Sequence, residues 1–194
     1  MIKYLFASLL LLGSTQVTLA QSSILDFYNL YKKNYETRQM HRQKLTIIKK
    51  NIANGYLQMR FTPGVGYQNG VKSYSEEMAY FVATNGNRFV VVASSYLDPQ
   101  NGKFTANPSN YIRKWGLPQF YEIRNGELKY ANKNYLPLAT EKKMTNVCGI
   151  KDFWIKLPEY GTTIKVGSWV NGQIKTLGEL RFNLAKGNFN FVKL

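Results

Sequence analysis

The segment MAYFVATNGNRFVVVA (residues 78–93) holds an Asn-Gly pair between two apolar stretches. Asn-Gly pairs favour two-residue hairpin turns of type I′, in which both central residues need a positive φ. A turn of this kind at Asn85-Gly86 pairs Val82 with Phe89 and places apolar side chains on both faces of the hairpin. We therefore expect this hairpin to lie in the interior, between two layers of structure.

A second hairpin is predicted at Asn125-Gly126, and its two faces differ. One face pairs Ile123 with Leu128 and is apolar, so it should pack on a core. The other face pairs residues of opposite charge, which favours strand pairing on a solvated face. These charged pairs are Arg124 with Glu127 and Glu122 with Lys129. Further Asn-Gly pairs occur at residues 54–55, 69–70, 101–102 and 171–172.

The region from residue 56 to residue 194 is predicted to be rich in β-structure. Leu57, Met59 and Phe61 alternate with polar residues, as on the two faces of a strand. The spacing of the Asn-Gly pairs is too irregular for a repeat protein. We predict one α+β domain over residues 21–194, mainly hairpin-rich antiparallel sheet, sandwich-like or half-barrel, with one or two N-terminal helices packed on it.

Residues 21–55 are predicted to be helical. Ser23 and Asp26 have the spacing of a capping box at a helix start, and Gly55 is suited to close a helix. A first apolar stripe contains Ile24, Phe27, Tyr28, Tyr31 and Tyr35. A second, displaced stripe contains His41, Leu45, Ile48 and Ile52. The displacement predicts two helices, or one helix that bends near residues 35–39, covering the sheet.

Residues 1–20 have the pattern of a signal peptide. Lys3 precedes the apolar segment Leu5–Leu12, and Thr18-Leu19-Ala20 provides a cleavage site with small residues. The apolar segment is too short to span a bilayer, which takes about 20 residues. We expect export to the periplasm or the medium, a mature chain from about Gln21, and no transmembrane span in that chain.

The chain is strongly basic, with 26 Lys and Arg against 11 Asp and Glu and a net charge of +15. Loss of Lys3 with the signal leaves +14. In an exported protein this charge favours anionic envelope lipids or acidic glycans, although it can also be an ordinary solvated surface. Nucleic acid is a less favoured partner, since no recognition motif is present. The candidate ligand-binding residues are Lys32, Lys33, Arg38, Arg42, Lys49, Lys50, Arg113, Lys114 and Trp115.

Catalytic and metal-binding signals are weak. His41 is the single histidine and Cys148 the single cysteine, so neither an internal disulfide nor a structural zinc site is expected. Cys148 is interpreted as a small buried apolar residue. Glu76 and Glu77 are neighbours on a strand and should point to opposite faces, so they should not share a site. We expect no catalytic residues, metal or cofactor.

These observations favour an exported, non-enzymatic protein that binds an anionic partner. One alternative is an exported hydrolase of the glycosidase type, which needs only two suitably spaced carboxylates. Another is a structural subunit that associates with another envelope protein. Trp115 is the tryptophan expected at the surface, whereas Trp154 and Trp169 are expected to be buried.

Overall fold

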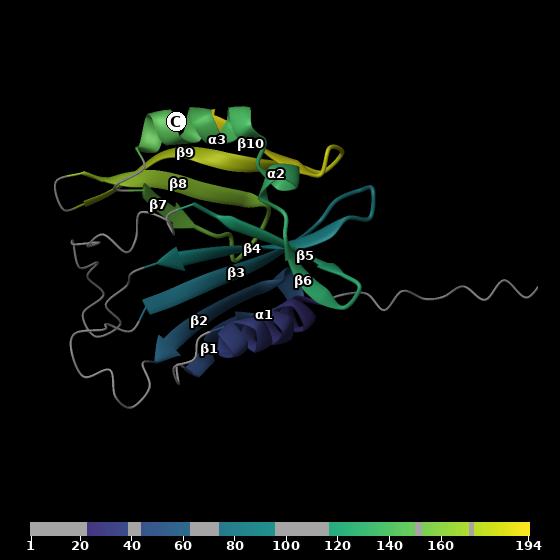
Figure 1. The fold of residues 1–194 in the computed structure, drawn as a ribbon. Coiled ribbons are helices and arrows are strands. Elements are labelled where there is room, and N and C mark those ends of the chain that lie inside the picture. Colours follow the sequence, from purple (N-terminus) through teal and green to yellow (C-terminus); the bar gives the residue numbers. More distant parts are fainter. Residues whose placement is uncertain (1–22, 39–43, 63–73, 96–116, 150–152, 171–172) are drawn as a thin grey trace, which may run out of the picture.

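The computed structural model describes residues 23–38, 44–62, 74–95, 117–149, 153–170 and 173–194 (Figure 1). The chain begins with helix α1 (Ile24–Arg38), strand β1 (Lys44–Asn51), the short 3₁₀ helix η1 (Ile52–Asn54) and strands β2 (Tyr56–Thr62), β3 (Tyr74–Val82) and β4 (Arg88–Ser95). It continues with β5 (Gln119–Arg124), β6 (Glu127–Tyr130), α2 (Asn132–Tyr135), α3 (Leu138–Cys148), β7 (Phe153–Lys156), β8 (Thr163–Val170), β9 (Gln173–Asn183) and β10 (Asn188–Lys193).

The strands form two antiparallel sheets. Strands β1 to β6 make a six-stranded sheet in sequence order, and β7 to β10 make a four-stranded sheet, also in sequence order. Figure 1 shows α1 on the lower side of the six-stranded sheet, with the four-stranded sheet and α3 on its upper side. The architecture confirms the predicted α+β fold dominated by antiparallel hairpins.

The six-stranded sheet is buried on both faces. On one face, Phe81, Phe89 and Val91 belong to a core shared with the four-stranded sheet, α2 and α3, which we call the inter-sheet core. On the other face, Met78 and Val90 belong to a second core that is covered by α1. The prediction that the β3–β4 hairpin is apolar on both sides and lies between two layers is therefore confirmed.

The predicted register of this hairpin is wrong by one residue. Phe81, not Val82, lies opposite Phe89, and Val82 lies opposite Arg88. The loop contains three residues instead of two, because Ala83 N donates to Asn87 O at 2.9 Å and encloses residues 84–86. Gly86 takes the positive φ of 84° that such a loop needs at its last position.

The hairpin at Asn125-Gly126 has the predicted register. Both turn residues have positive φ, 53° and 75°, and Glu122 pairs with Lys129 as expected. The ion pairs, however, run along each strand and not across the hairpin. Arg124 contacts Glu122, and Lys129 contacts Glu127, because side chains two residues apart on a strand share a face.

The second N-terminal helix is a wrong prediction, because residues 44–51 form strand β1, paired with β2. The β-branched run Thr46-Ile47-Ile48 favours a strand, and the pairing with β2 is irregular between Ile47 and Lys49. The helix-like spacing did not mark a buried face, because Ile48 and Ile52 are exposed. Gly55 does end a helical turn, with φ of 64°, but that turn is the short η1.

Helix α1 starts as the capping box predicts. Asp26 N donates to Ser23 Oγ at 3.3 Å, and Ser23 N donates to the Asp26 carboxylate at 2.6 Å. Ile24, Phe27 and Tyr31 are buried against the six-stranded sheet, so the helix is a cover and not a detached arm. Helices α2 and α3 were not predicted. Pro137 directly precedes α3 as its N-cap residue, so it marks a helix start, whereas strand β6 already ends at Tyr130.

A buried carboxylate joins the two sheets. The Glu77 side chain on β3 is only 3% exposed and accepts hydrogen bonds from Tyr56 Oη at 2.7 Å and Leu157 N at 2.9 Å. Lys156 on β7 completes an ion pair with it. Burial, and then the charge of Glu77, raise the pKa of Tyr56, so its hydroxyl remains a donor to the carboxylate.

We expect Glu77→Gln to lower the free energy of unfolding by about 2 kcal/mol, because hydrogen bonds to a charged group are worth about 1.5–3 kcal/mol. The side-chain NH₂ group of the new glutamine would also face hydrogen-bond donors, from which it cannot accept a hydrogen bond. Urea unfolding measures this loss of stability, with Glu179→Gln as the control variant. Glu179 pairs with the exposed Arg181, so its change should alter stability by less than about 0.5 kcal/mol. Equal effects of the two changes would contradict a joining role for Glu77.

Candidate anion-binding site at the turn end

Three hairpin turns meet at one end of the molecule. They are the β3–β4 turn (84–87), the β5–β6 turn (125–126) and the β9–β10 turn (184–187), and we call this region the turn end. Leu184 O accepts hydrogen bonds from Thr84 N at 3.1 Å and Thr84 Oγ1 at 3.0 Å. The first and third turns are thus fixed to each other although about 100 residues separate them in sequence.

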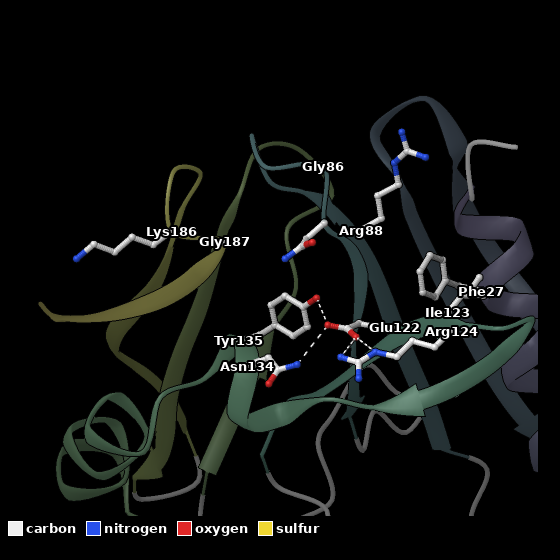
Figure 2. A pocket seen from close by; sticks show the side chains of 11 residues that line it. Phe27, Gly86, Arg88, Glu122, Ile123, Arg124, Asn134, Tyr135, Lys186 and Gly187 are labelled. Atoms are coloured by element: carbon white, nitrogen blue, oxygen red, sulfur yellow. Dashed lines mark hydrogen bonds and ion pairs between the residues drawn. The ribbon is translucent and has the colours of Figure 1, made fainter. Parts of the chain in front are cut away.

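A pocket of about 510 Å³ opens at the turn end (Figure 2). Its basic residues lie in or beside the three turns: Arg88 begins β4, Arg124 ends β5 and Lys186 lies in the β9–β10 turn. Strand β5 also contributes the single carboxylate of the lining, Glu122. The remaining lining residues come from α1, β5, α2 and the turns: Phe27, Gly86, Asn87, Ile123, Asn134, Tyr135 and Gly187.

The carboxylate in the pocket is already fully engaged. Glu122 accepts hydrogen bonds from Tyr135 Oη and, at 3.4 Å, from Asn134 Nδ2, and it forms an ion pair with Arg124 (Figure 2). Burial, and then Glu122, raise the pKa of Tyr135, which keeps its hydroxyl protonated as a donor. A carboxylate offers about four acceptor positions, so Glu122 orients these neighbours and has little capacity left for a ligand.

Two cations remain available at the rim. Figure 2 shows Arg88 and Lys186 on opposite sides of the pocket, extending away from the Glu122 group. Within the described parts of the chain, neither side chain takes part in an ion pair. With Arg124 paired to Glu122, Arg88 and Lys186 are the two rim cations that form no ion pair with a described residue.

The residues that the sequence singled out do not form one helical basic face. Lys32 and Lys33 lie on α1, but Lys49 and Lys50 lie on strand β1. Lys49 pairs with Glu159 at 2.6 Å, and this hydrogen bond raises its pKa. The other candidates lie outside the described residues or, for Arg38, have no described side chain: Arg38, Arg42, Arg113, Lys114 and Trp115.

Glu76, Glu77 and the cysteine Cys148 are all buried. Glu76 accepts a hydrogen bond from Tyr31 Oη at 2.7 Å on the α1 side, whereas Glu77 faces the inter-sheet core, so the two carboxylates do point apart. Cys148 is buried in that core, and burial raises its pKa to about 11, which keeps the thiol protonated. His41 lies outside the described residues.

Among the described residues, no three His, Cys, Asp or Glu side chains gather in a way that could hold a metal ion. None of the described helices is long and apolar enough to cross a membrane. Trp154 is half-buried on β7, and the Trp169 side chain is outside the described part. No protein-family model, curated protein or solved structure matches the chain.

Proposed function

We propose that the protein is an exported, non-enzymatic binding protein whose turn end holds an anionic partner, either an acidic glycan or an anionic envelope lipid. The observation that carries the proposal is the meeting of three basic residues, each in or beside a different hairpin turn, around a pocket whose single carboxylate is already engaged. Export rests on the signal pattern of residues 1–20.

The chemistry of the pocket suits an oxyanion. A guanidinium has five N–H donors; Arg124 donates from Nε to Glu122, and its Nη2 forms an ion pair with the same carboxylate. The donors of this guanidinium that Glu122 does not take remain for a ligand. Arg88 and Lys186 add charge from either side, and the side-chain amides of Asn87 and Asn134 add neutral donors. Charge-assisted hydrogen bonds of this kind are the stronger ones available to a surface site.

The proposal predicts that removing the two rim cations weakens binding more than removing two other charges. We expect Arg88→Gln with Lys186→Gln to lower affinity for a heparin column and for vesicles of anionic lipid about tenfold or more, since each basic residue near an anionic surface is worth about 1 kcal/mol. Arg124 is kept, because its removal would leave Glu122 without its ion pair.

The matched control is Lys142→Gln with Lys143→Gln, two exposed lysines of α3 that also lower the net charge by two. Both double variants should be compared by salt elution from the column and by sedimentation with vesicles. Earlier elution of the rim variant alone supports the turn end as the site. Equal elution of both variants would mean that net charge alone drives retention, and the proposed site would be rejected.

A further inference from the structure

Two exposed aliphatic side chains lie beside the rim cations. Val82 at the end of β3 is 44% exposed and lies opposite Arg88 in the hairpin. Leu184 in the β9–β10 turn is 49% exposed and is two residues before Lys186. The Thr84 hydrogen bonds to Leu184 O hold these two segments next to each other. The turn end therefore presents apolar and cationic groups together.

We propose that the turn end docks on the surface of an anionic bilayer, with Val82 and Leu184 entering the boundary between headgroups and acyl chains. Arg88 and Lys186 would contact lipid phosphates at the same time. Apolar groups flanked by basic ones are what a surface needs to bind the membrane interface from one side. This inference rests on the proposed function and chooses a lipid surface as the partner.

The exposed groups favour lipid over glycan. Sugar-binding sites commonly offer an accessible aromatic face to the ring. Both aromatic residues that line this pocket are buried, with Phe27 at 0% and Tyr135 at 2% exposure, so neither presents such a face. The accessible apolar groups at the turn end are aliphatic, and aliphatic groups gain from leaving water for a bilayer.

The turn end is also firmly held, so docking needs no folding of the binding surface. Gly187 lies so close to the β3–β4 turn that an added Cβ would be 3.2 Å from Ala83 Cβ. Asn87 N donates to Asn85 Oδ1 at 3.0 Å, and Lys186 N donates to Asn183 Oδ1 at 2.9 Å, which fixes both turns locally. A surface of fixed shape loses little conformational entropy when it binds.

The test separates the contribution of the aliphatic side chains to membrane binding from the contribution of the basic side chains. Vesicles containing phosphatidylglycerol and phosphatidylcholine should sediment the protein, whereas pure phosphatidylcholine vesicles should not. Val82→Ser with Leu184→Ser should weaken binding to the anionic vesicles about tenfold and leave retention on heparin unchanged. The control is Leu138→Ser with Leu194→Ser, which changes two aliphatic residues that are 65% and 64% exposed outside the turn end. The control variant should bind like the unchanged protein.

Each outcome decides the inference. Retention on heparin without any binding to anionic vesicles overturns membrane docking and leaves the proposed function standing. Unchanged vesicle binding by the Val82 and Leu184 variant also overturns it, because the aliphatic groups would then not enter the bilayer. Absence of both heparin and vesicle binding would reject the proposed function together with the inference. Circular dichroism of each variant shows whether it is folded.

Discussion

Replacing Phe89 with alanine is expected to lower the free energy of unfolding by about 4 kcal/mol, since Phe→Ala changes in a packed core cost about 3–5 kcal/mol. Phe89 is fully buried and stacks on Phe81 and Tyr135, with ring centroids 5.4 Å and 3.7 Å away. It also meets Phe182 and Phe189 of the four-stranded sheet edge to face. Its removal would open a cavity where both sheets and α2 join.

Urea unfolding followed by circular dichroism measures this change. Tyr130→Ala is the matched control, because Tyr130 is also aromatic but 63% exposed. The control change should lower the free energy of unfolding by less than about 1 kcal/mol. A loss below about 1.5 kcal/mol for Phe89→Ala would contradict the packing described for the inter-sheet core.

Gly167→Ala is expected to lower the free energy of unfolding by about 3 kcal/mol or more, because overpacking against fixed backbone forces strands apart. Gly167 lies at the irregularity in the β8–β9 pairing, next to Val166. A Cβ at this position would be 1.9 Å from Lys175 O. That oxygen belongs to the backbone of the paired strand, so no side-chain rotation can relieve the contact.

Gly161→Ala distinguishes steric contact from backbone strain. Gly161 has φ of 78°, yet an added Cβ would meet nothing within 4 Å. This change should cost about 1–2 kcal/mol through the left-handed conformation alone. If thermal and urea unfolding gave Gly167→Ala the smaller effect, the tight approach of β8 to β9 would be wrong.

The fold was predictable where a local signal has one structural meaning. Asn125-Gly126 gave the correct hairpin and register, because both turn residues take the positive φ that the pair favours. Asn85-Gly86 gave a hairpin with the wrong register. Its loop has three residues, and the sequence around an Asn-Gly pair does not decide between a two-residue and a three-residue loop.

Strand β1 shows why the spacing of apolar residues alone wrongly predicted a second helix. Leu45, Ile48 and Ile52 recur with helix-like intervals, but Leu45 is buried whereas Ile48 and Ile52 are exposed, so the three share no buried face. Pairing with β2 and the local preference of its β-branched residues both favour a strand for this segment. The β-branched residues around Ile47 were the available signal, and they carried less weight than the apolar spacing.

The candidate site was not predicted from sequence, although its parts were visible there. Arg88, Arg124 and Lys186 each lie within two residues of a glycine at a hairpin turn. The sequence gives no sign that the β3–β4 and β9–β10 turns belong to different sheets and still meet at one end. Only the packing of the two sheets around Phe89 brings these cations together.

The most direct test of an anion-binding turn end is a nuclear magnetic resonance titration of the mature protein with a short heparin oligosaccharide, a soluble polyanion. We expect the amide signals of Gly86, Asn87 and Gly187 to shift in a saturable, salt-sensitive manner, while those of Lys142 and Lys143 on α3 stay in place. Shifts confined to α1 or α3, or no shifts at low salt, would contradict a binding site at the turn end.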